Sequence, residues 1–278
     1  MPMFDASSTI DDFIDPDEVP RPVMTFGMSI VTDGMELDFH RHRKAELLLT
    51  IRGVVTCEAG NGLWIVPPQC AIWIPAGVMH NIKGLGTIEA CCAFIEPTMA
   101  PTLPTSCCTV SVTPLLRELL SRCAHFPALY REGGAESHLV TLLLDEIAAA
   151  PTENLHLPMP TDGRLRRIAE LMMTTPSDRG TMGTWAKRVG LSERTLARMI
   201  VRQTGMSFGR WRQQFTIMLA LQWLGKGVSI QKVAADLGYE SAGSFVTMFG
   251  KVLGTSPGRY MAERRRSARA PFNGQAAA

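Results

Sequence analysis

The chain has 278 residues, of which 46% are hydrophobic, enough for two domains of ordinary size. Its net charge is only +2, but residues 161–278 carry 19 Lys and Arg against 7 Asp and Glu, whereas residues 1–160 carry 9 against 19. No apolar run approaches the ~20 residues that cross a bilayer, and the acidic N-terminus lacks a signal-peptide pattern, so we expect a cytoplasmic protein without membrane contact.

The first part of the chain reads as a flexible lead-in followed by a small β-domain. Residues 1–22 are acidic and weakly patterned, so we expect them to be mostly disordered. Residues 23–100 contain short apolar runs separated by turn signals such as Gly60-Asn61-Gly62. Room for roughly eight strands predicts a small antiparallel barrel or jelly roll.

Three histidines and one carboxylate in this β-domain are candidate site residues. His40 and His42 are at alternate positions, so on a strand their side chains point to one side. The segment also resembles the cupin motifs, whose residues are given below, and that resemblance implies that Glu46 and His80 would complete the ligands of a divalent metal in a metal-binding cupin. The alternative is that these four residues and Trp73 line a pocket for an organic effector, and we expect no other cofactor.

The seven cysteines all precede residue 124, and no pair has a Cys-X-X-Cys spacing. We interpret them as reduced thiols that act as small hydrophobic side chains. A redox sensor is the alternative.

Two helices are predicted between residues 101 and 150. Thr113 can cap a helix that begins at Pro114, and a second apolar stripe covers residues 136–149. These stripes could cover the barrel or form a dimer interface, and we favour the dimer. Residues 151–160 contain three prolines and are the predicted linker.

The basic part of the chain contains an internal duplication. At an offset of 48, Ala186 and Gly190 align with Ala234 and Gly238, and the register then continues at an offset of 49 through Gly205 and Gly254. In each copy a short helix is followed by a tight turn and a second helix, predicted over residues 193–204 and 242–253. A connecting helix is predicted from Phe208 to Leu224. This is the pattern of two helix-turn-helix units, a fold that presents its second helix to the DNA major groove.

These units, with the segments Gly238-Tyr239-Glu240-Ser241 and Gly254-Thr255-Ser256-Pro257-Gly258-Arg259-Tyr260, resemble the DNA-binding domain of the AraC/XylS family of transcription regulators. The likeness covers residues 161–262. Gly34, His40, His42, Glu46 and Gly53 are similar to the first cupin motif, and Pro75, Gly77 and His80 to part of the second. The resemblance implies an α+β chain with a cupin-like sensor barrel at residues 23–100, a helical segment at 101–150 and an all-α double helix-turn-helix domain. Gln69 and Gly84 depart from the second cupin motif, which weakens the implied metal site.

Helical geometry predicts which side chains of the second helix in each unit face DNA. In the first unit Arg194 and Arg198 occupy the centre of the polar face, flanked by Thr195, and arginine can pair bidentately with guanine. In the second unit the outward side chains are small, so Ser244 and Thr247 are expected to read bases only weakly. The predicted phosphate contacts are Lys187, Arg202 and Lys251.

We therefore interpret the chain as a regulator that binds double-stranded DNA in response to a small-molecule effector. The resemblance implies a homodimer, and contact with RNA polymerase if the protein is an activator. The alternative is a cupin metalloenzyme, an oxygenase or isomerase, fused to a DNA-binding domain. Residues 263–278 are predicted to be a basic, polar tail.

Overall fold

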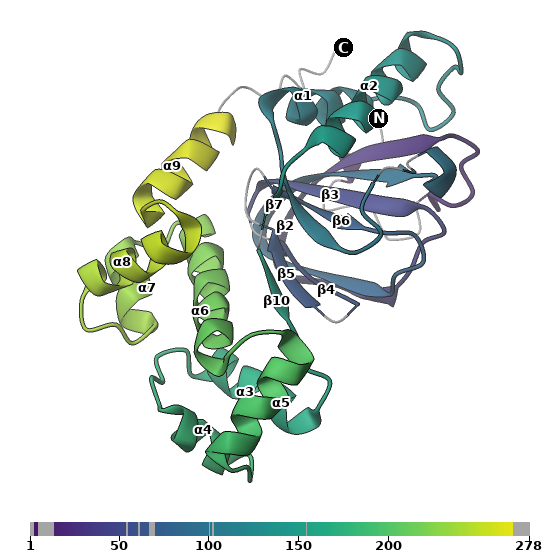
Figure 1. The fold of residues 1–278 in the computed structure, drawn as a ribbon. Coiled ribbons are helices and arrows are strands. Elements are labelled where there is room, and N and C mark those ends of the chain that lie inside the picture. Colours follow the sequence, from purple (N-terminus) through teal and green to yellow (C-terminus); the bar gives the residue numbers. More distant parts are fainter. Residues whose placement is uncertain are drawn as a thin grey trace. The chain divides into compact units, whose positions relative to one another are not determined.

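The structure is a computed structural model that describes residues 3–4, 14–53, 55–60, 62–66, 70–99, 101, 103–153 and 155–268. Two compact units are distinguished, and each is described by itself (Figure 1). The first comprises residues 1–60, 66–155 and 263–278, and the second comprises residues 61–65 and 156–262. None of the helices in the described ranges has the length and hydrophobicity to cross a membrane.

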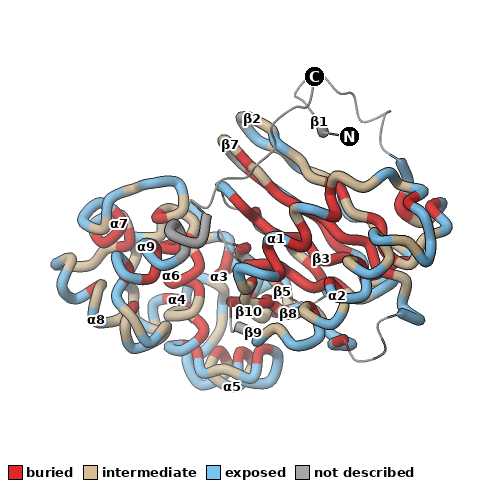
Figure 2. The backbone as a smooth tube through the Cα atoms, turned by 90° about the horizontal axis from the view of Figure 1, so that it is seen from above, coloured by how far each residue is buried: buried red, intermediate tan, exposed pale blue. Residues whose placement is uncertain are grey.

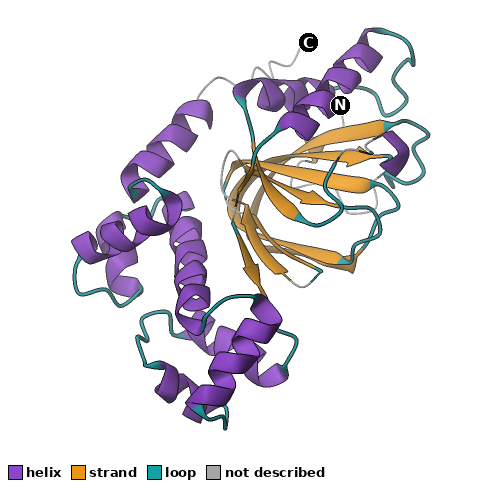
Figure 3. Cartoon of the chain, viewed as in Figure 1, coloured by secondary structure: helices purple, strands orange, loops and turns teal. Residues whose placement is uncertain are grey.

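The first unit is built around antiparallel strands that bend into a barrel-like shape (Figure 3). Its strands are β1 (Met3–Phe4), β2 (Val23–His40), β3 (Ala45–Arg52), β4 (Val55–Ala59), β6 (Cys70–Ile74), β7 (His80–Ile95), β8 (Cys108–Ser111) and β9 (Thr152–Glu153), with a short 3-10 helix η2 (Pro97–Met99). Strand β7 pairs with β2 along one edge, and with β3 and β4 in succession along the other. Strands β6, β8 and β9 extend the sheet from β3.

The described residues of the window 24–94 form fewer strands than the roughly eight expected from turn signals. Strand β2 has 18 residues and β7 has 16, so each is longer than the short strands that the turn signals suggested. Register shifts between Thr32 and Met35 and between Leu37 and His40 bend β2 without ending it. Gly60 has φ 55° in the turn after β4, as the hairpin prediction requires.

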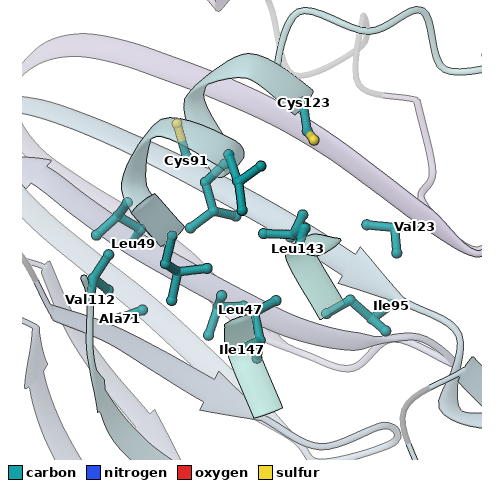
Figure 4. Packing of buried hydrophobic residues seen from close by; sticks show 14 of the residues in the cluster. Val23, Leu47, Leu49, Ala71, Cys91, Ile95, Val112, Cys123, Leu143 and Ile147 are labelled. Carbon is teal, nitrogen blue, oxygen red and sulfur yellow. The ribbon is translucent and has the colours of Figure 1, made fainter. Parts of the chain in front are cut away.

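Two helices cover the outer face of this sheet, α1 (Pro114–Cys123) and α2 (Ala135–Ala149). Thr113 accepts a hydrogen bond from the Leu116 amide and caps α1 as predicted. Figure 4 shows the core beneath the helices, where Leu47 and Leu49 of β3 meet Leu143 and Ile147 of α2. The apolar stripes thus cover the barrel, the alternative ranked second from sequence. Leu115 and Leu142, at 48% and 40% exposure, remain on the outside.

The predicted lead-in and linker both contain segments that pack. Residues 1–2 and 5–13 lie outside the described part of the chain, but Met3 and Phe4 pair with β2, and the segment around Asp17 contacts the residues just before β3. The Asp17 carboxylate accepts the amides of Arg43 and Lys44, and the buried Lys44 ammonium donates to the Val19 carbonyl. The predicted linker contains β9 and β10 (His156–Pro158). These segments are therefore ordered by long-range contacts that their composition does not indicate.

The second unit is helical apart from the pair of β10 with β5 (Gly62–Val66). Its helices are α3 (Gly163–Thr174), α4 (Met182–Arg188), α5 (Glu193–Thr204), α6 (Phe208–Gly225), α7 (Ile230–Asp236), α8 (Ala242–Leu253) and the first half of α9 (Pro257–Ala268), up to residue 262. Buried positions gather along α6, which connects the two helix pairs (Figure 2). The predicted tail begins inside α9, and residues 269–278 lie outside the described part.

The cysteines behave as the sequence prediction states, since all seven are free thiols and five are buried. Burial raises the pKa of Cys91 to about 12 and those of Cys107 and Cys123 to about 11. A reactive thiol needs a lowered pKa and exposure, so these groups lack the properties of a redox sensor. We expect negligible reaction of the native protein with Ellman's reagent at neutral pH and full reaction of seven thiols after denaturation. A rapidly reacting thiol in the folded protein would contradict this assignment.

Candidate functional site

The duplicated sequence forms two matching helix-turn-helix units, α4–α5 and α7–α8. The turn glycines Gly190 and Gly238 both have positive φ, 67° and 72°. The residue that directly follows each turn glycine donates its backbone amide to the carbonyl of the aligned alanine. Leu191 donates to Ala186, and Tyr239 donates to Ala234. The duplication inferred from sequence is thus repeated in dihedral angles and hydrogen bonds.

Both second helices begin and end where they were predicted. Ser192 and Ser241 cap α5 and α8, and Gly205 and Gly254 end them in the left-handed conformation. A pair of apolar residues at aligned positions is buried in each helix, Leu196 and Ile200 in α5 and Phe245 and Phe249 in α8, and α5 also buries Thr204 in its last turn. A buried pair of this kind fixes the rotation of the helix, and therefore the side chains that it can present to DNA.

The positively charged residues predicted to contact DNA in the first helix-turn-helix unit are exposed. Arg194, Arg198 and Arg202 lie on α5 and Lys187 on α4. No residue in the described part of the chain forms an ion pair with these three arginines, whereas Arg188 pairs with Asp178 at 2.6 Å. Unpaired arginines on an exposed helix face are available to phosphates and base edges. Thr195 is half-buried, and its hydroxyl interacts with the capping Ser192.

The corresponding face of α8 offers less hydrogen-bonding capacity. The Ser244 hydroxyl lies 3.0 Å from that of the capping Ser241, and the Thr247 hydroxyl donates to the Gly243 carbonyl. Lys251 is exposed in the last turn. Two of the three predicted contact residues therefore use their hydroxyls in contacts within this helix-turn-helix unit, and the weak reading of bases by α8 stays a prediction.

In the β-domain, the structure brings together the three histidines and the carboxylate that were predicted as a site. His40 ends β2 and His80 begins β7, and the two are direct cross-strand partners. Glu46 pairs with Ile74 on β6 and with Phe94 on β7, which places its side chain on the inner face of the sheet. His42 lies between β2 and β3. Local strand geometry and sheet register together produce this cluster.

The ring nitrogens of His40, His42 and His80 that can bind a metal all lie within 4.8 Å of one another. Glu46 Oε2 is 3.1 Å from His80 Nε2 and 3.9 Å from His42 Nε2. The other nitrogen of two of the rings is held by the backbone, since His40 Nδ1 lies 2.7 Å from the Asp38 carbonyl and His80 Nδ1 lies 2.9 Å from the Val78 carbonyl. A carbonyl accepts only from a protonated nitrogen, so both rings direct Nε2 into the cluster.

The pKa values of His42 and His80 are shifted in opposite directions. Burial lowers the pKa of His42, and the nearby Glu46 only partly opposes this. Burial also disfavours the charged form of His80, but contact with the Glu46 carboxylate outweighs it and raises the pKa of His80. The cluster therefore combines a neutral imidazole with a carboxylate-histidine pair.

Trp73, predicted as part of the same pocket, belongs to the other face of the sheet. It pairs with Leu47 and is buried in the core under α1 and α2, with its indole N–H donating to the Pro104 carbonyl. Glu46 and Leu47 are adjacent, so their side chains point to opposite faces. Phe94 lies on the inner face instead, with its ring 4.9 Å from that of His42. The sequence shows Phe94 in an apolar run, but it does not show that Phe94 pairs with Glu46 of β3.

Comparison with known proteins gives matches to both units. Residues 185–263 match a helix-turn-helix domain family, and residues 32–87 match an AraC-like ligand binding domain family. The chain is 43% identical over 248 residues to the HTH-type transcriptional regulator NimR of Escherichia coli K12, covering 89% of this chain and 90% of that protein. It is 29% identical over 103 residues to the regulator RipA of Corynebacterium glutamicum, covering 37% of this chain and 31% of RipA. A structure of fatty-acid-bound ToxT from Vibrio cholerae aligns with a TM-score of 0.36 and 10% identity, covering 86% of this chain and 94% of ToxT.

Proposed function

The chain belongs to the AraC family of DNA-binding transcription regulators, and we propose that it recognises its operator mainly through α5 while a small molecule bound in the N-terminal barrel controls that binding. The observation that carries the assignment of α5 is its exposed row of arginines without ion-pair partners in the described part of the chain. Arg194 and Arg198, flanked by Thr195, are assigned to base edges, and Arg202 and Lys187 to phosphates. Helix α8 contributes weaker contacts through Ser244, Thr247 and Lys251.

The effector site is assigned to the inner face of the barrel, at His40, His42, Glu46 and His80. This cluster gathers three imidazoles and a carboxylate beside the apolar Phe94 on the inner face of the sheet, and pockets that bind small molecules combine an apolar lining with a few convergent polar groups. The barrel is assigned a sensing role, with no catalytic reaction of its own, because its matched relatives are named as transcriptional regulators. Binding of the effector would shift the equilibrium between DNA-binding arrangements of the protein.

We further propose that the regulator acts in the cytoplasm as a homodimer, and that it contacts RNA polymerase if it activates transcription. The exposed Leu115 of α1 and Leu142 of α2 support a dimer contact on the outer side of the helices, although most of both apolar stripes is already used against the sheet.

Selection of bound fragments from genomic DNA tests this function. At near-physiological salt the purified chain is expected to enrich a motif with a strongly defined element for α5 and a weakly defined one for α8, about one helical turn or 10 base pairs away. The selection is run with and without cell extract as a source of effector. Fragments no richer in any motif than the input, under both conditions, would contradict sequence-specific binding.

A further inference from the structure

We propose that the loop of residues 175–181 holds the two helix-turn-helix units in one relative placement, with Arg179 as its positioning residue. The loop would thereby limit the operator spacings that the chain accepts. The inference deepens the proposed function and rests on it, because spacing matters only if both units contact DNA. The placement itself is measured without DNA, so it can fail while the regulator assignment stands, and the reverse also holds.

The loop joins α3 to α4, yet it contacts the turn of the second helix-turn-helix unit. A Cβ atom on Gly238 would lie 2.2 Å from the Ser177 carbonyl oxygen, so the two backbones are in close contact there. The guanidinium of the exposed Arg179 lies 4.2 Å from the centre of the Tyr239 ring, which is the distance of a cation–π contact. The loop therefore covers two consecutive residues of the turn after α7.

The contact of Arg179 continues into the helix that follows this turn. The half-buried Tyr239 ring lies 5.5 Å from the ring of Phe245, in an edge-to-face arrangement. Phe245 is fully buried and belongs to the pair that fixes the rotation of α8. One aromatic ring thus connects Arg179 with the core position of α8.

The same loop is fastened to the first helix-turn-helix unit. The Asp178 carboxylate accepts the Gly180 amide at 2.8 Å and pairs with Arg188 of α4 at 2.6 Å. The half-buried Arg212 of α6 donates to the Gly180 carbonyl at 2.6 Å. Through Asp178 and Arg179, the loop links α4 to the turn after α7 by a path that does not pass along α6.

Two separate connections constrain the placement of the two units more than one does. Helix α6 contacts α5 as well as α7 and α8, but a single connecting helix leaves bending and twisting at its ends as possible motions. A second connection through the loop opposes both motions. One base pair of DNA changes the separation of two sites by about 3.4 Å and their rotation by about 35°. A chain with a fixed placement should therefore discriminate between operators that differ by one base pair in spacing.

The first test is a distance distribution measured by pulsed electron paramagnetic resonance on the full chain without DNA. Spin labels are attached at the exposed positions Val201→Cys of α5 and Ala235→Cys of α7. We expect a narrow distribution for the natural loop and a broader one for Arg179→Ala. Arg179→Lys keeps a cation over the ring and should restore the narrow distribution. The chain without the two introduced cysteines gives the background from its own thiols.

Arg167→Ala is the matched control, because Arg167 is an exposed arginine of α3 that pairs with Glu170. It should leave the distance distribution unchanged. Circular dichroism of each variant establishes that it is folded. Equal widths for the natural loop and a folded Arg179→Ala variant would overturn the proposal.

The second test uses operators in which one base pair is added or removed between the two elements. The natural chain should bind the altered operators more weakly than the selected one. In Arg179→Ala this penalty should shrink by about 2- to 5-fold, which corresponds to an exposed cation–π contact of about 0.5–1 kcal/mol. An equal loss of affinity at every spacing would instead make Arg179 a phosphate contact and overturn the proposal. If no operator is found, the proposed function fails, and the distance distributions still decide the placement.

Discussion

Replacing Gly238 by alanine is expected to destabilise the second helix-turn-helix unit severely, whereas the same change at Gly190 should be mild. Both residues have positive φ, which costs an alanine about 1–2 kcal/mol. A Cβ on Gly238 would in addition lie 2.2 Å from the Ser177 carbonyl oxygen, but a Cβ on Gly190 would meet nothing within 4 Å. Because the clashing atom belongs to the backbone, we expect a further loss of about 1–3 kcal/mol from overpacking.

Hydrogen exchange resolved by peptide measures this effect where it arises. Amides of α7 and α8 should lose protection in Gly238→Ala, and those of α4 and α5 should lose much less in Gly190→Ala. Asparagine separates the two causes, since it tolerates positive φ but keeps a Cβ. Gly190→Asn is expected to resemble the natural chain, and Gly238→Asn to remain destabilised. Equal losses at the two positions would show that the contact with Ser177 is unimportant.

The second large effect is expected at the DNA surface, where Arg194→Ala should lower the preference for the operator over random DNA. A bidentate arginine contact with guanine discriminates by about 1–3 kcal/mol, which is roughly 5- to 150-fold. Affinity for random DNA should change little. Binding of operator and random duplexes, measured at several salt concentrations, provides both quantities.

Arg202→Ala is the matched comparison, because Arg202 lies on the same helix and is also exposed. As a phosphate contact, it should weaken binding to both duplexes similarly and reduce the slope of log affinity against log salt by about 0.9. If Arg194→Ala instead lowers both affinities equally, Arg194 contacts phosphate and its assignment to a base edge is wrong.

Sequence reasoning was most accurate in the helical unit, because the signals there are local. The capping serines act within three residues of the helix start, and the terminal glycines act one residue beyond the helix end. These signals predicted the bounds of α5 and α8. The duplication added an independent check on each position.

Predictions in the β-domain were less complete, because strand pairing joins residues that are distant in the chain. Composition suggested more breaks than β2 and β7 contain, and it suggested disorder for residues that Lys44 and Arg43 hold in place. The assignment of Trp73 to the pocket was wrong, because the sequence does not show which side chains of β6 point to the inner face of the sheet. A shift of one residue in register reverses every side chain of a strand, so no local pattern could decide it.

Residue types and short spacings were enough to identify the family, the two helix-turn-helix units, the outward arginines of α5 and the four polar residues of the barrel cluster. Three features became known only from the folded chain: His40 and His80 are cross-strand partners, Glu46 lies buried 3.1 Å from His80, and the outer helices cover the sheet. These features depend on long-range register and packing, which are fixed when the whole sheet forms.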